Sequence, residues 1–102
     1  MSTEKKSRPF SPEELDQIAS RFKMLGEPMR LRILQVVCRE ARSVNDIVAA
    51  TGSTQANVSK HLALLTAAGM LTREKDGQCV FYGMKDPLTV KLCELVRAQL
   101  AD

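Results

Sequence analysis

The chain has 102 residues, enough for one small domain, and 44% of them are hydrophobic while 26% are charged. No run of 18 apolar residues is present, and the first ten residues lack the apolar centre of a secretory signal, so we expect a cytoplasmic protein without a membrane span. The net charge of +3 permits binding to nucleic acid without requiring it.

Residues 1–10 are predicted to form a flexible arm, and residues 11–102 a single domain. The first predicted helix begins at Ser11, whose side chain can cap it, and Pro12 suits the first helical position. Its apolar stripe has helical spacing and consists of Leu15, Ile18, Ala19, Phe22 and Leu25. Gly26 is predicted to end this helix.

A second helix is predicted from Pro28. The residues expected on its buried face are Leu31, Leu34, Val37 and Cys38, widened by Ile33 and Ala41. The residues expected to remain outside are Arg30, Arg32 and Arg39. These arginines are most simply interpreted as a solvated surface.

Two further helices are predicted on either side of Gly52. The third runs from Ser43 to Ala50 and has Ser43 as its cap. The fourth is capped by Ser53 or Thr54 and runs to about residue 68, just before Gly69. The residues expected to anchor the fourth helix to the core are Val58, Leu62 and Leu65.

The pattern then changes to that of a β-hairpin around Asp76-Gly77, a dipeptide typical of tight turns. Counting back from this turn predicts that Arg73 pairs with Val80 and Leu71 with Tyr82. A last helix is predicted after Asp86-Pro87, with an apolar face that includes Leu88, Leu92, Leu95 and Val96. The chain is therefore expected to be mainly α with a small β-hairpin, in the order of a winged helix-turn-helix.

The fourth predicted helix carries polar side chains suited to the major groove of DNA, and residues 53–69 contain no acid. Gln and Asn can form two hydrogen bonds to adenine, and Ser and Thr can contact bases or phosphates. The candidate DNA-binding residues are Ser53, Thr54, Gln55, Asn57, Ser59, Lys60 and His61. For His61, the only histidine, packing is the alternative to a DNA contact, and both are favoured over metal ligation or catalysis. An ordinary amphipathic surface helix is the alternative interpretation.

The predicted hairpin carries Arg73 and Lys75 beside two acids. Basic side chains on a wing can reach a phosphate or the minor groove. An exposed turn of mixed charge is the alternative, so the hairpin adds a candidate DNA contact.

Four segments together resemble the ArsR/SmtB family of bacterial winged-helix repressors: residues 25–34, 55–62, 68–71 and 80–82. The resemblance runs from about residue 15 to 100. It implies a homodimer joined through the first and last helices, an inverted-repeat operator in double-stranded DNA, and release of that DNA when an inducer binds.

The chain departs from the metal-sensing members of that family. A Cys-Val-Cys site of the third helix corresponds here to Ser43-Val44-Asn45, which has no thiol. A second family site, on the last helix, corresponds to Asp86, Leu88, Gln99 and Asp102, which include no histidine. We therefore expect no conventional metal site and no cofactor, while a non-standard site between subunits stays open.

Cys38 and Cys93 form a candidate thiol switch, because other family members sense oxidants or persulfides through cysteines of the second and last helices. The familiar positions correspond here to Gln35 and Ala101, so both thiols are displaced along their helices. Buried packing of the two cysteines is the alternative.

No nucleophile with a neighbouring base and no phosphate-binding loop is found, so we do not expect an enzyme. The function predicted is a dimeric, sequence-specific transcriptional repressor whose inducer is unknown. The alternatives are a winged-helix module that binds another protein, and a metal-responsive repressor with a non-standard site.

Overall fold

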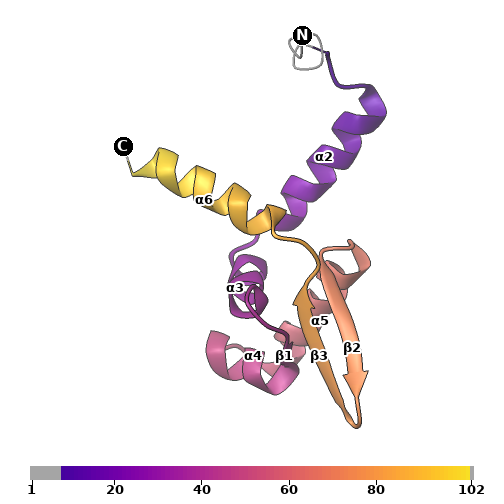
Figure 1. The fold of residues 1–102 in the computed structure, drawn as a ribbon, viewed down its shortest axis with the longest axis vertical. Coiled ribbons are helices and arrows are strands. Elements are labelled where there is room, and N and C mark those ends of the chain that lie inside the picture. Colours follow the sequence, from indigo (N-terminus) through magenta and orange to yellow (C-terminus); the bar gives the residue numbers. More distant parts are fainter. Residues whose placement is uncertain (1–7, 102) are drawn as a thin grey trace.

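The computed structural model describes residues 8–101. Within that range it contains five helices and three strands, in the order α2 (Pro12–Leu25), α3 (Pro28–Val37), β1 (Arg42–Ser43), α4 (Val44–Thr51), α5 (Gln55–Ala67), β2 (Leu71–Asp76), β3 (Cys79–Met84) and α6 (Leu88–Leu100). The predicted order of four helices, a hairpin and a helix is confirmed (Figure 1). The seven N-terminal residues of the predicted arm and Asp102 lie outside the described residues.

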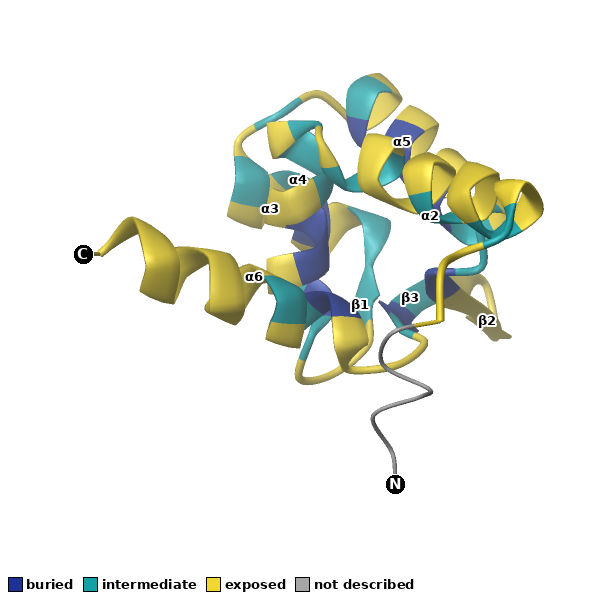
Figure 2. Cartoon of the chain, turned by 90° about the horizontal axis from the view of Figure 1, so that it is seen from above, coloured by how far each residue is buried: buried dark blue, intermediate teal, exposed yellow. Residues whose placement is uncertain are grey.

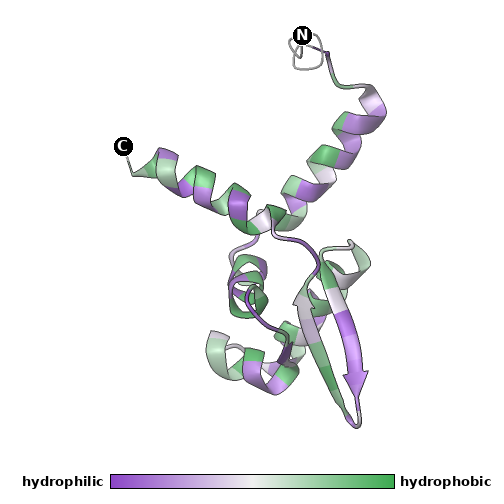
Figure 3. Ribbon diagram, in the orientation of Figure 1, coloured by the Kyte–Doolittle hydropathy of each residue, from purple (hydrophilic) through white to green (hydrophobic). Residues whose placement is uncertain are grey.

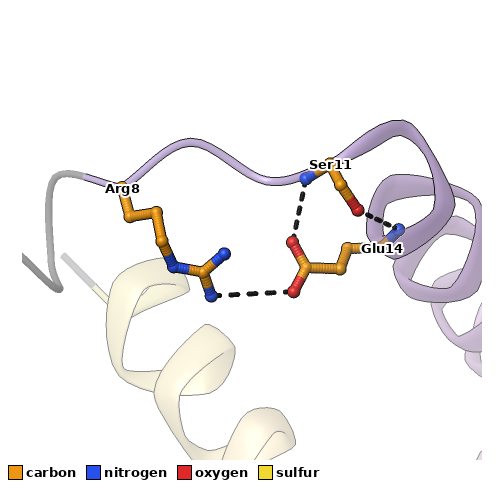
Figure 4. Close-up of polar contacts among 3 residues, drawn as sticks. All are labelled: Arg8, Ser11 and Glu14. Atoms are coloured by element: carbon orange, nitrogen blue, oxygen red, sulfur yellow. Dashed lines mark hydrogen bonds and ion pairs between the residues drawn. The ribbon is translucent and has the colours of Figure 1, made fainter.

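The start of α2 is fixed by a capping box (Figure 4). The Glu14 amide donates to Ser11 Oγ at 3.1 Å, and the Ser11 amide donates to Glu14 Oε1 at 2.8 Å. Both bonds satisfy amides that the helix itself leaves free. Arg8 lies 3.6 Å from the second carboxylate oxygen of Glu14, an exposed ion pair that contributes little to stability.

The core lies where α3, α4 and α5 meet the start of the hairpin (Figure 2). Its buried hydrophobic residues are Ile33, Leu34, Val37, Ile47, Val58, Leu62, Leu65, Met70 and Leu71. The predicted anchors of α5, Val58, Leu62 and Leu65, are thus confirmed. The face predicted for α3 is partly wrong, because the helix ends at Val37, Leu31 is exposed and Ala41 lies beyond the helix end.

The hairpin belongs to a three-stranded antiparallel sheet with the order β1-β3-β2. The sequence did not predict β1, which has only two residues; its Arg42 pairs with Tyr82. The predicted register is also wrong: Arg73 pairs with Tyr82 and Leu71 with Met84. The shift is two residues along β3, which leaves every side chain on its predicted face of the sheet.

The register differs because the two turn residues are Gly77 and Gln78. Asp76 stays extended and pairs with Cys79. Gly77 has a φ of 67°, and no non-glycine residue among those described has a positive φ. A positive φ at the first turn residue alone is typical of a type II′ turn, whereas Asp-Gly as the central pair predicts positive φ at both positions.

The hairpin of β2 and β3 is the wing, and its tip is the turn at Gly77 and Gln78. α2 and α6 project from the body and diverge from each other, on the side opposite this tip (Figure 1). No residue of α2 is buried, and Phe22 is 56% exposed. The large exposed hydrophobic residues of α6 are Leu88, Leu95, Val96 and Leu100. Hydrophobic residues recur along both helices (Figure 3), and several of them are left exposed by the described part of the chain. No helix within residues 8–101 is long and apolar enough to cross a membrane.

Candidate nucleic-acid interface

The turn between α4 and α5 is built by local hydrogen bonds. α4 ends at Thr51 and is followed by Gly52, which has a left-handed φ of 71° and whose amide donates to Val48 O. Thr54 then caps α5, because its side-chain oxygen accepts from the Asn57 amide at 3.1 Å. The turn and the cap together set the direction in which α5 leaves α4.

One face of α5 is polar and accessible, and the other is buried. Val58, Leu62 and Leu65 are fully buried and hold the helix on the core. Among the DNA-binding residues predicted on α5 and in the turn before it, the exposed ones are Thr54, Gln55, Ser59 and Lys60. With no acidic side chain from residue 53 to 69, this exposed face suits a polyanion.

Ser53 and Asn57 are half-buried and bonded to each other. The Asn57 amide nitrogen Nδ2 donates to Ser53 Oγ at 2.9 Å, one helical turn earlier in the chain. The side chain of Asn57 therefore has a partner before any base arrives. Gln55 has no such bond among the described contacts and stands in the first turn of the helix, where a major-groove reader is expected.

His61 does not belong to this accessible face. It is only 6% exposed, and its Nδ1 accepts a hydrogen bond from Arg30 Nε at 3.2 Å. This burial supports packing as the role of His61, and its contact with DNA stays an untested prediction. The same bond corrects the expectation that Arg30 stays outside.

Arg30 is half-buried and hydrogen-bonded, unlike the solvated arginine that its charge predicts. It precedes Ile33, Leu34 and Val37 at spacings of three, four and seven residues. Those spacings place residues on one helix face, and these three are buried. The helical spacing of Arg30 therefore indicates a place beside the core, although its charge indicates an exposed position.

The wing presents Arg73 and Lys75, both exposed, two residues apart on β2. Alternate residues of a strand share a face, so the two cations point the same way. Arg73 Nε donates to Tyr82 OH at 3.3 Å on the neighbouring strand. This bond orients the guanidinium on one face of the wing.

The two cysteines of the predicted switch line the same pocket, which has a volume of about 420 Å³ and lies between α3 and α6. Cys38 is half-buried and its thiol donates to Gln35 O at 3.1 Å, whereas Cys93 is exposed. Arg39 and Arg97 also line this pocket. Cys79, on β3, is exposed and does not line it.

Metal-ligating residues do not gather within the part of the chain that the structure describes. No group of three or more His, Cys, Asp or Glu side chains there is placed to hold an ion.

The class of this protein follows from its elements. It is a winged helix-turn-helix protein, because the short helix α4, a turn and the capped helix α5 are followed by a β-hairpin in a three-stranded sheet. Residues 27–73 match the family model described as "Bacterial regulatory protein, arsR family". A "Probable mercury resistance operon repressor" from Streptomyces lividans is 34% identical over 87 residues, which cover 85% of this chain and 70% of the relative.

Solved structures agree with this match. The crystal structure of Mycobacterium tuberculosis Rv0081 has a TM-score of 0.78 at 30% identity and covers 90% of this chain and 92% of its own. The solution structure of the homodimeric winged helix-turn-helix DNA-binding domain Mb0332 from Mycobacterium bovis has a TM-score of 0.75 at 27% identity, covering 92% and 90%. The chain belongs to the ArsR family. It is a DNA-binding transcriptional repressor rather than an enzyme.

Proposed function

We propose that two copies of this chain bind an inverted-repeat operator and leave it when an inducer binds. The observation that carries the proposal is the exposed, acid-free face of α5 around Gln55, Ser59 and Lys60. One such helix from each copy would enter successive major grooves, about 34–36 Å apart. A repressor of this kind works where the bacterial chromosome lies, in the cytoplasm.

The unpartnered faces of α2 and α6 support a homodimer. Phe22 on α2 and Leu95 and Val96 on α6 are more than half exposed in the single chain. Helices that are apolar on an uncovered face are typical of an interface. The homodimeric relative from Mycobacterium bovis has the same fold, so a second copy of this chain is the occupant we propose.

The test is a comparison of specific and random DNA. A duplex selected from a random pool by the wild-type protein should bind about a thousandfold or more tightly than random duplex, and both affinities should fall steeply as salt rises. Fluorescence anisotropy over a salt series measures both quantities. Equal affinity for the two duplexes would contradict sequence-specific repression. Binding to neither would instead favour a module that recognises another protein.

A thiol-directed inducer is the second candidate, favoured by the shared pocket of Cys38 and Cys93. Thiolates are soft ligands that suit soft metal ions, and the Streptomyces lividans relative is described as a mercury resistance operon repressor. A mercuric ion that displaces the two thiol protons would bridge Cys38, directly after α3, and Cys93 on α6. Inorganic polysulfide could form a trisulfide between the same thiols and leave as hydrogen sulfide. Either bridge would shift α6 and with it the second copy.

Matched cysteine variants test this candidate. Mercuric ion or inorganic polysulfide should release wild-type protein from its operator, and Cys38→Ser and Cys93→Ser should stay bound. Cys79→Ser is the control, because this exposed cysteine lies outside the pocket and the variant should respond like the wild type. Melting curves check that the serine variants remain folded. Wild-type protein that stays bound under treatment would contradict a thiol-directed inducer.

A further inference from the structure

One guanidinium connects three helices of the domain. Arg30 stands in the first turn of α3, and its Nη1 donates to Met24 O and to Met24 Sδ, both at 3.2 Å, near the end of α2. Its Nε donates to His61 Nδ1 on α5, also at 3.2 Å. The group is partly buried, so these bonds are shielded from competing water.

The contact needs a planar group with several donors at residue 30 and an acceptor at the position of His61 Nδ1. A guanidinium carries five donors in a rigid planar fork, so it can bond to two elements at once in fixed directions. A lysine has a single flexible ammonium group and cannot reproduce that fork. For His61 Nδ1 to accept, the imidazole must be neutral with its proton on Nε2.

The elements joined by Arg30 have different tasks. α5 carries the polar face proposed to meet DNA, and α2 carries part of the face proposed to meet the second copy. His61 and Gln55 lie on the same helix, within two turns of each other. The direction of α5 relative to α2 sets where Gln55 lies relative to the same residue of the second copy.

We propose that Arg30 is a positioning residue: through His61 and Met24 it fixes the recognition helix α5 relative to the dimerisation helix α2, and so sets the half-site spacing that the dimer accepts. This inference rests on the proposed function. Its particular consequence is a loss of discrimination between spacings, which general destabilisation would not produce.

The experiment uses the operator selected by the wild-type protein, the same operator with two base pairs inserted at its centre, and random duplex. The wild type should prefer the original spacing. Arg30→Lys and His61→Leu should bind the original operator about tenfold more weakly, with the inserted operator and random duplex nearly unchanged. Sedimentation velocity checks that each variant is a dimer, and a melting curve checks that it is folded at the assay temperature.

Two controls separate positioning from packing. His61→Asn places an amide oxygen near the position of Nδ1 and should restore the spacing preference, which a purely steric role of the imidazole would not allow. Arg32→Lys, on an exposed residue of α3, should behave like the wild type. Nitrogen NMR should show the Nδ1 resonance of His61 shifted by the hydrogen bond from Arg30 in the wild type, and this shift should change in Arg30→Lys.

The results distinguish failure of the positioning role of Arg30 from failure of the proposed function. If Arg30→Lys retains the wild-type spacing preference, or loses affinity equally for all three duplexes, the inference is overturned while the proposed function stands. If the wild type itself shows no preference for its selected operator over random duplex, the proposed function fails and this inference fails with it.

Discussion

Single side chains on α5 divide into those free to meet a base and those already engaged. Gln55 is exposed in the first turn, whereas Asn57 is bonded to Ser53 and His61 to Arg30. The sequence predicted all of them as one polar set, because helical spacing identifies a face but not the partner of each side chain. Partners such as Arg30, 31 residues earlier in the chain than His61, come from tertiary packing.

Gln55→Ala should weaken binding to the selected operator by about 1–3 kcal/mol, the worth of one lost bidentate base contact, and should leave random DNA nearly unaffected. Gln17→Ala removes an exposed glutamine from α2 and is the matched control. Anisotropy titrations of both variants on both duplexes decide the matter. Equal losses on the two duplexes would show that Gln55 does not read bases.

The turns between elements carry backbone demands that can be tested by adding one methyl group. Gly52 has a φ of 71° and no heavy atom within 4 Å of where a Cβ would stand. Gly52→Ala should therefore destabilise the fold by about 1 kcal/mol through conformation alone.

Gly26→Ala is the control, because Gly26 has a φ of −82° and its Cβ would make only ordinary contacts. Urea unfolding of both variants gives the two free energies. Equal free energies of unfolding would contradict the claim that the left-handed turn after α4 is what requires glycine.

The wing is proposed to meet the DNA backbone. Replacing Arg73 and Lys75 together by alanine should weaken binding to every sequence and lower the slope of log affinity against log salt by up to about two. Gln78→Ala, an uncharged change at the turn, should leave the slope unaltered. A slope unchanged by the double replacement would remove the wing from the interface.

At the scale of elements, the order and type of all five helices followed from caps and apolar periodicity, as Ser11, Ser43 and Gly52 show. The sequence could not indicate β1, because two residues give no alternation to detect. The hairpin register was missed because turn propensity alone cannot distinguish Asp76-Gly77 from Gly77-Gln78 as the central pair. In the structure, Gly77-Gln78 is the central pair of the turn, and β3 is paired with a strand on each side.

At the scale of the whole molecule, the dominant feature is the pair of helices that leave the body with apolar faces uncovered. Phe22→Glu should place a charge in the proposed interface and give monomers in sedimentation velocity at micromolar concentration, with operator affinity reduced. Ser20→Glu alters an exposed residue of the same helix away from the apolar stripe, and it should remain dimeric. A dimeric Phe22→Glu protein would show that α2 is not in the interface.

Because of the uncovered faces of α2 and α6, the stability and the DNA binding of the chain should depend on its concentration. If association supplies the missing contacts, the melting temperature should rise with protein concentration by mass action. Below the dimer dissociation constant, occupancy of the operator should then grow with the square of the monomer concentration. A modest change in the synthesis of this chain would thus change repression more than proportionally, even without any inducer.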